Sequence, residues 1–400
     1  MSRPSVPVAL LALLLLGAGC TSRQGAHPLT SVERDTYEER LEKAQPFLVG
    51  PRGTPELEAL ARELEARLEH HPRDAALHAL LARTALALKR DDQARAEAQR
   101  VEALAPDSAE AHFLRAFFLG GRDPEKLATA LAEAQRATEL DPQRGRSWRL
   151  LGTLHLQRQQ PAEARAALER ALALEPDNAQ ALFLSGLLAE DEGRADAALL
   201  AFEKASRVAP DFVLAHTHAG RHLQDARRNE AALEHFQRAA ALAPRDWRIR
   251  ERLVQVHQAL GNTARRDAER EALLALHREG GMDQDFYIRE QWHEGPWLIA
   301  VVENLELKGD WARRYEFQVF GASGERPERV ISLGSYAFTN DFAREKNPSA
   351  PRLFHLDAYG ADDSHETYGL FEGEPSYDDT RARVLAILRG ELPPSSSSKR

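Results

Sequence analysis

Two short stretches of the sequence hold side chains that could carry chemistry at close spacing. In the first, "HTHAGRH", His218 and His222 lie one helical turn apart and could both reach one metal ion. No carboxylate or cysteine ligand stands at a fixed spacing nearby, and His216 and His218 would point in different directions on a helix. The pattern therefore favours structural or surface histidines over a metal site.

The second stretch is "DAYGADDSHETYG", which combines carboxylates with an imidazole. Asp357, Asp362, His365 and Glu366 could bind a metal ion or act as general acid and base. A charged hairpin tip between two strands explains the same residues equally well. We favour the hairpin tip, because charged residues gather in exposed turns without any catalytic role.

Motifs for familiar enzyme chemistry are absent from the sequence. It contains no glycine-rich phosphate loop, no HExxH and no GxSxG. The single cysteine, Cys20, excludes both an intramolecular disulfide and a zinc site built from cysteine pairs. The 53 basic and 62 acidic residues give a net charge of −9, which argues against binding to nucleic-acid phosphates. We therefore expect a protein that is not an enzyme and that carries no metal and no cofactor.

The N-terminus has the pattern of an export signal. Arg3 precedes the apolar run "VPVALLALLLL", which is too short to span a bilayer, and the small residues "GAGC" follow it. The run resembles a bacterial lipoprotein signal, in which a lipid is attached to a cysteine that becomes the new N-terminus. The resemblance implies that residues 1–20 contain the signal peptide and that Cys20 is the lipidated residue.

The resemblance is incomplete at Gly17, where the family usually has leucine. The alternative is cleavage near Cys20 by an ordinary signal peptidase, which would release a soluble secreted protein. Thr21 follows the cysteine, and in enterobacterial lipoproteins a residue other than aspartate there implies the outer membrane. We expect an outer membrane lipoprotein that faces the periplasm, contacts the membrane through its lipid, and has a flexible polar tether at residues 21–30.

A proline recurs along the chain at nearly constant spacing. Successive spacings are 34, 36, 34, 34 and 34 residues for the prolines Pro72, Pro106, Pro142, Pro176, Pro210 and Pro244. Between two of them, residues 145–178 have the apolar pattern of two helices, with Pro161 suited to begin the second. Such periodicity predicts stacked helical hairpins.

The repeat resembles the tetratricopeptide repeat, in which small residues lie where the two helices cross and a large residue packs beside them. The matching residues are Gly152, Ala164 and Leu168 in one unit, Gly186, Ala198 and Phe202 in the next, and Gly220, Ala232 and Phe236 in the third. The resemblance implies an α-solenoid, a superhelix of helical hairpins, over residues 31–280 with about five full repeats and degenerate ends. Arg266 and Arg270 replace apolar residues in the last unit, which predicts a capping hairpin with a wet outer face.

After "REGGMDQD" the helical pattern ends and β-rich runs begin. Tyr315, Phe317 and Val319 alternate with polar residues, as in a half-buried strand, and Ser376 can cap a final helix. Residues 283–391 are therefore predicted to form a small α+β domain with an antiparallel sheet, which resembles no family that we can name. Residues 392–400 are predicted to be a disordered tail.

The resemblance also implies a groove lined by the first helices, where partners bind. The residues at inward-facing positions include Arg83, Phe113, Phe117, Arg146, Arg149, Phe183, Glu190, Asp191, Arg221 and Asp225. Ala79 and Arg83 stand where chaperone-binding relatives hold a peptide carboxylate with lysine and asparagine, so we expect no such clamp. The phenylalanines either meet the partner or pack between adjacent first helices, and both interpretations remain open.

These features predict a membrane-anchored scaffold or adaptor that binds protein or peptide partners in the bacterial cell envelope. The alternative is an envelope enzyme or ligand-binding protein whose C-terminal β domain carries the site, while the repeats recruit the substrate. Neither the identity of the partner nor the oligomeric state follows from the sequence.

Overall fold

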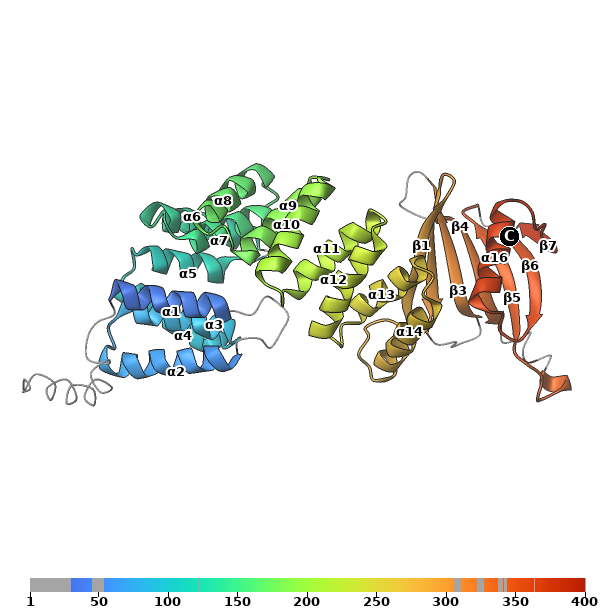
Figure 1. The fold of residues 1–400 in the computed structure, drawn as a ribbon, viewed down its shortest axis with the longest axis horizontal. Coiled ribbons are helices and arrows are strands. Elements are labelled where there is room, and N and C mark those ends of the chain that lie inside the picture. The colour runs from blue at the N-terminus through green and yellow to red at the C-terminus, as the bar shows by residue number, and fades with distance from the viewer. Residues whose placement is uncertain are drawn as a thin grey trace, which may run out of the picture. The chain divides into compact units, whose positions relative to one another are not determined.

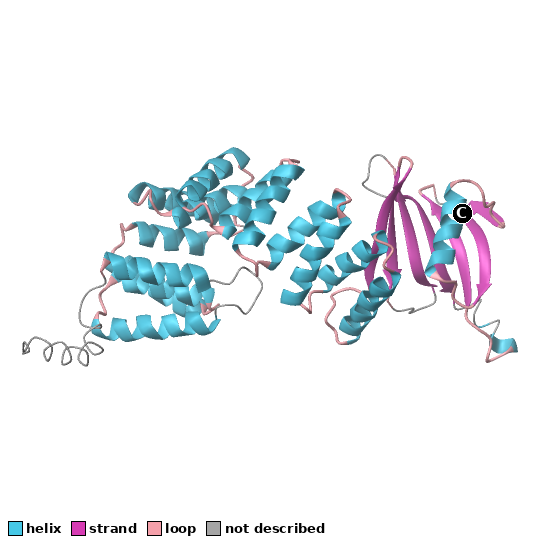
Figure 2. Cartoon of the chain, in the orientation of Figure 1, coloured by secondary structure: helices cyan, strands magenta, loops and turns pink. Residues whose placement is uncertain are grey.

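The protein is described by a computed structural model that covers residues 30–44, 54–121, 123–305, 311–321, 327–336, 341, 344–362 and 364–399. The predicted signal peptide with Cys20, and the tether up to residue 29, lie outside the described residues. The chain divides into two compact units between His218 and Ala219. Figures 1 and 2 show helical hairpins followed in the chain by a β-sheet.

The hairpins alternate a first and a second helix. The first helices are α1 (Ser31–Ala44), α3 (Ala75–Ala87), α5 (Ala109–Leu119), α7 (Gly145–Gln157), α9 (Ala179–Asp191), α11 (Val213–Asp225) and α13 (Trp247–Ala259). The second helices are α2 (Thr54–His70), α4 (Asp91–Leu104), α6 (Pro124–Leu140), α8 (Pro161–Leu174), α10 (Ala195–Val208), α12 (Asn229–Leu242) and α14 (Thr263–Arg278). This confirms the α-solenoid of helical hairpins that the proline spacing predicted.

Each turn between hairpins ends one helix and begins the next. In "EPDN", Asn178 accepts a hydrogen bond from the N–H of Ala181 at 2.9 Å and so caps α9, as Asp74, Ser108 and Asp246 do for their helices. The turn proline contributes its carbonyl, because the fourth residue of several first helices bonds to it. The pairs are His78 with Pro72, Trp148 with Pro142, His216 with Pro210, and Arg250 with Pro244.

The two helices of a hairpin approach closely at a glycine. A Cβ atom on Gly186 would lie 2.5 Å from Cε1 of Phe202, and one on Gly152 would lie 2.8 Å from Cγ of Leu168. Gly220 and Phe236 repeat the arrangement in the C-terminal compact unit. These glycines allow the large residue of the second helix to pack directly on the backbone of the first helix.

A seven-stranded antiparallel meander follows, in the spatial order β1 to β7. Its strands are β1 (Phe286–Glu294), β2 (Trp297–Asn304), β3 (Trp311–Phe320), β4 (Pro327–Tyr336), β5 (Leu353–Gly360), β6 (Ser364–Glu372) and β7 (Ser396–Lys399). Helix α16 (Tyr377–Leu388), capped by Ser376 as predicted, covers one face with Val384 and Ile387. Phe317 and Phe354 lie in the core beneath it, so the predicted α+β domain with an antiparallel sheet is present.

Two segments of this domain differ from the prediction. The supposed hairpin tip is mostly strand, since Asp357 lies within β5 and His365 and Glu366 lie within β6. The supposed disordered tail contains β7, in which Ser396 pairs with Thr367 of β6 and Lys399 pairs with Ser364. Both segments have polar sequences, and their pairing rests on backbone hydrogen bonds that the side-chain pattern does not record.

The other edge of the sheet is covered by the last hairpin. Glu251 of α13 accepts a hydrogen bond from the N–H of Ile288 in β1 at 2.5 Å, and Gln255 donates to the carbonyl of Ile288 at 2.7 Å. Arg270 of α14 forms an ion pair of 2.6 Å with Glu303 of β2. The predicted wet outer face of this hairpin is therefore wrong, because β1 and β2 lie against it.

Glu303 is the centre of that contact. Its side chain is fully buried, and Arg289 Nη1 and the Tyr287 hydroxyl bond to its Oε2 at 2.5 and 2.6 Å. Burial alone would raise the pKa of Glu303, but Arg289 and Arg270 outweigh burial and lower it. The pairing of β1 with β2 is irregular between Ile288 and Glu290, a bulge that includes Arg289.

Among the described residues, we find no helix with both the length and the apolar character needed to cross a membrane.

We predict that Gly186→Ala destabilises the helical array, because the new methyl group would lie 2.5 Å from the buried ring of Phe202. Overpacking of this kind costs about 1–3 kcal/mol, which exceeds the gain in helix propensity. Urea denaturation followed by circular dichroism measures the loss. Gly121→Ala is the control, since a Cβ there meets no atom within 4 Å. Equal stability of the two variants would contradict the prediction.

Candidate functional site: a charged cavity between the first helices

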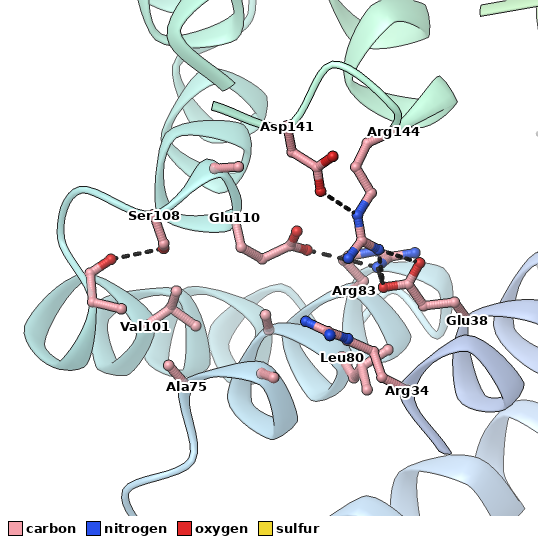
Figure 3. Close-up of a pocket in the computed structure, with 14 residues that line it drawn as sticks. Arg34, Glu38, Ala75, Leu80, Arg83, Val101, Ser108, Glu110, Asp141 and Arg144 are labelled. Carbon is pink, nitrogen blue, oxygen red and sulfur yellow. Dashed lines mark hydrogen bonds and ion pairs between the residues drawn. The ribbon is translucent and has the colours of Figure 1, made fainter. Parts of the chain in front are cut away.

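A cavity of about 260 Å³ lies among the first helices of the N-terminal unit (Figure 3). Alanines and a serine leave this space open at the starts of α3 and α5. Charged side chains surround it from α1, from α3, from the start of α5 and from the turn before α7. Its charged lining residues are Arg34, Glu38, Arg83, Glu110, Asp141 and Arg144.

Beside the cavity, Glu38 of α1 holds arginines from two other segments. Its carboxylate receives hydrogen bonds from Arg144 Nη1 at 2.6 and 2.7 Å and from Arg146 Nη1 at 2.6 Å. Arg83 of α3 lies 3.7 Å from the same carboxylate. Glu38 thus joins the first hairpin to residues more than a hundred positions later in the chain.

Glu110 of α5 completes the cluster. It accepts a hydrogen bond from Arg146 Nη2 at 2.6 Å and lies 3.6 Å from Arg83. Asp141 accepts a hydrogen bond from Arg144 Nε at 2.6 Å, within the turn before α7. Figure 3 shows Glu38, Arg83, Glu110 and Arg144 pointing toward one another from α1, α3, α5 and the turn before α7. We call Glu38, Arg83, Glu110, Arg144 and Arg146 the charge cluster.

The arginines keep both glutamates of the charge cluster ionised. Burial alone would raise the pKa of Glu110, but Arg146 and Arg83 outweigh it and lower the pKa to about 2. The same competition lowers the pKa of Glu38, with Arg146 as the largest favourable influence. The pKa of Arg146 is raised, because Glu110 and Glu38 outweigh its own desolvation. All members of the cluster are therefore charged at neutral pH.

The sequence singled out Arg83 and Arg146 as groove residues, and both belong to the charge cluster. Each is buried, and the guanidinium of Arg146 also lies 5.8 Å from the ring centroid of Phe113. Phe113 is buried as well, whereas Phe117 is 44% exposed. Arg83, Arg146 and Phe113 therefore contact residues of the chain itself. The ring of Phe117 meets that of Phe118 edge-on at 5.7 Å, and the rest of it is open.

Phe183 does not face an open groove. Only 5% of it is exposed, and its ring centroid lies 4.9 Å from that of Phe212 and 5.4 Å from that of Phe202. The imidazole of His218 meets it edge-on at 5.2 Å. The interpretation that this phenylalanine packs between helices holds, and its exposure to a partner does not.

The remaining groove candidates are more accessible. Arg149 donates a hydrogen bond to Gln180 of the next first helix and is half-buried. Glu190 pairs with His218 at 3.2 Å, and Asp191 is exposed. Arg221 and Asp225, on α11, are half-buried and exposed, respectively, in the C-terminal unit.

The histidines of "HTHAGRH" have structural contacts. His216 bonds to the carbonyl of Pro210, and His218 bonds to Glu190, so the two point in different directions as expected. Within the described residues, no group of three or more histidine, cysteine, aspartate or glutamate side chains is arranged to hold a metal ion.

The four residues of "DAYGADDSHETYG" are divided between places. Asp357 is buried on the sheet, where Thr367 donates to it at 2.8 Å and His365 lies 3.4 Å away. Glu366 bonds instead to Arg329 and Tyr368, and Asp362 lies in the turn. The structure therefore brings Asp357 and His365 together and places the other two apart.

A family model described as tetratricopeptide repeat matches residues 150–211, which run from α7 to the turn after α10. The hairpins of this segment are tetratricopeptide repeats. The glycine crossings, the capped turns and the proline period described above agree with this assignment.

No curated protein matches the chain. Among solved structures, it is similar to pilF of Pseudomonas aeruginosa, with TM-score 0.46 and 18% identity over 52% of this chain and 94% of that chain. It is also similar to YrrB, a TPR protein with an unusual peptide-binding site, with TM-score 0.33 and 22% identity over 51% and 99% of the two chains. A chain of the APC/C hetero-tetramer Cut9-Hcn1 gives TM-score 0.49 and 15% identity over 62% of this chain, which spans 47% of that chain.

Sequence reasoning missed the two glutamates of the charge cluster. Glu110 stands at the second position of its repeat, the same position as Arg146 in the next, so repeat alignment could have found it. Glu38 lies in the degenerate first hairpin, where the repeat pattern assigns no position. Its role appears only when α1 is placed beside α3 and the start of α7.

We predict that Arg146→Met destabilises the N-terminal unit by about 3 kcal/mol, because it leaves two largely covered carboxylates without their shared cation. Chemical denaturation measures the change. Arg136→Met is the matched control, since Arg136 pairs with Glu139 at 2.9 Å but both side chains are more than half exposed. That exposed pair contributes less than about 1 kcal/mol. Similar losses in the two variants would show that the cluster adds no stability.

Proposed function

We propose that this chain is a membrane-anchored adaptor of the bacterial cell envelope that holds a protein partner on the first helices of its repeats. The tetratricopeptide fold itself supports a protein-interaction scaffold, because stacked first helices present one long surface. The observation that carries the proposal is the sequence of side chains along that surface, from the charge cluster at α1, α3, α5 and α7 through exposed Phe117 to the acids of α9.

The anchor rests on the sequence. The only cysteine of the chain directly follows an apolar run and small residues, where lipoproteins carry their lipid. A lipid on Cys20 would hold the array at a membrane through the polar residues 21–30. Thr21, a residue other than aspartate after the cysteine, supports a location at the outer membrane, where the protein would face the periplasm.

We predict that Cys20→Ala moves the protein from membrane to soluble fractions, because the lipid would no longer be attached. Cell fractionation with immunoblotting, together with incorporation of labelled palmitate, measures the change. The substitution lies in the signal region, before the repeats, so the repeats should fold as in the native chain. Circular dichroism of the variant checks that they do. Membrane association that survives the substitution would remove the anchor from the proposal.

We predict that Phe117→Asp weakens capture of the envelope partner at least about tenfold, because exposed aromatic residues often contribute most to an interface. Affinity capture with quantitative mass spectrometry measures the partner. Leu200→Asp is the matched control, since Leu200 is an exposed apolar residue, 68% accessible, on the second helix α10. Equal capture by both variants would move the binding surface away from the first helices.

A further inference from the structure

We infer that α1 is the resident occupant of the charge cluster, and that the partner presents an acidic segment whose carboxylate replaces Glu38. This inference rests on the proposed adaptor function and names the chemistry of its partner. It concerns the cavity of Figure 3, where α1 contributes one carboxylate to arginines of α3 and of the turn before α7.

Glu38 binds as a ligand carboxylate would. Both of its oxygens accept hydrogen bonds from Arg144 Nη1, and Oε2 also accepts one from Arg146 Nη1, all within 2.7 Å. Arginine favours this recognition of carboxylates because its donors are fixed in one plane. Any other glutamate or aspartate that reached the same point would find the same donors.

The charges left behind define what can replace α1. Without Glu38, three arginines of the site face the two carboxylates of Glu110 and Asp141, so one buried positive charge lacks compensation. Buried charges without partners are strongly unfavourable. Another anionic group is therefore the occupant that best replaces α1, and the cavity of about 260 Å³ beside the cluster gives that group room.

Helix α1 is held by few apolar contacts. Tyr37 and Leu41 are its buried apolar residues among those described, and Val32 is 73% exposed. Three polar contacts join it to α2: the exposed ion pair of Arg40 with Glu63, the hydrogen bond from the Tyr37 hydroxyl to Glu63, and the ion pair of Glu33 with the largely buried Arg67. Among these, the exposed pair is screened by solvent and adds little. By contrast, α3 is buried from Leu77 through Ala85.

The test uses the full chain and a fluorescein-labelled, N-acetylated peptide with the sequence of residues 31–44. Fluorescence anisotropy measures binding. We expect Glu38→Gln in the chain to increase the affinity for the peptide at least about tenfold over the native chain, because the competing occupant is weakened. The gain should shrink as salt increases, and it should vanish when Arg144→Met is added to the chain.

Two controls isolate the carboxylate. Asp35→Asn removes an exposed carboxylate one turn earlier on α1 and should leave the affinity unchanged. A peptide with glutamine at the position of Glu38 should gain nothing from the chain variant. A second measurement uses the native chain: excess peptide should accelerate hydrogen exchange in the chain's own residues 31–44. This exchange measurement uses no substitution, so it stays valid even if Glu38→Gln disturbs folding.

Unchanged affinity after Glu38→Gln, together with unchanged exchange in α1, would overturn the inference. A peptide-independent dimer of Glu38→Gln would also overturn it, since a second copy would then supply the helix. If Phe117→Asp still abolishes partner capture in that case, the adaptor function stands and only the exchange of α1 fails. If the peptide binds while Phe117→Asp leaves capture unchanged, the adaptor surface fails and the exchange of α1 stands.

Discussion

The close approach of two helices at a small residue sets the spacing on which the repeat array depends. At Gly186 the ring of Phe202 takes the space that a side chain would occupy, so the two helices of that hairpin are held in one fixed packing. Repetition of this packing places equivalent positions of successive first helices side by side. The contact of Glu110 with Arg146, at the second positions of consecutive repeats, follows from that geometry.

The charge cluster is a departure from the regular contacts between neighbouring repeats. A repeat array needs no ion cluster at its inner surface, and buried charges usually add less stability than apolar packing. Here the cluster joins α1 to segments that lie far along the chain, through the bonds of Glu38 to Arg144 and Arg146. A cluster of this kind makes the position of α1 dependent on the charge of Glu38.

In the C-terminal part of the sequence, the sheet and the last hairpin cover each other's exposed groups. Its edge strand β1 would leave unpaired backbone groups, and the last hairpin would leave apolar surface without a following repeat. Glu251 and Gln255 satisfy the N–H and carbonyl of Ile288, and Arg270 neutralises the buried Glu303. Arg270, which the sequence placed on a solvent-facing cap, is therefore part of a contact between the hairpin and the sheet.

Local pattern in the sequence was enough for the hairpins, because proline period, capping residues and small residues at the crossings act within one repeat. The same holds for β3 and α16, whose alternation and Ser376 cap are local signals. Strands β6 and β7 escaped prediction because polar strands are held by backbone pairing. The pairing of Glu38 with Arg146 and of Arg270 with Glu303 was decided by tertiary structure alone. Such ion pairs form where separate elements meet, and no spacing along the chain records that meeting.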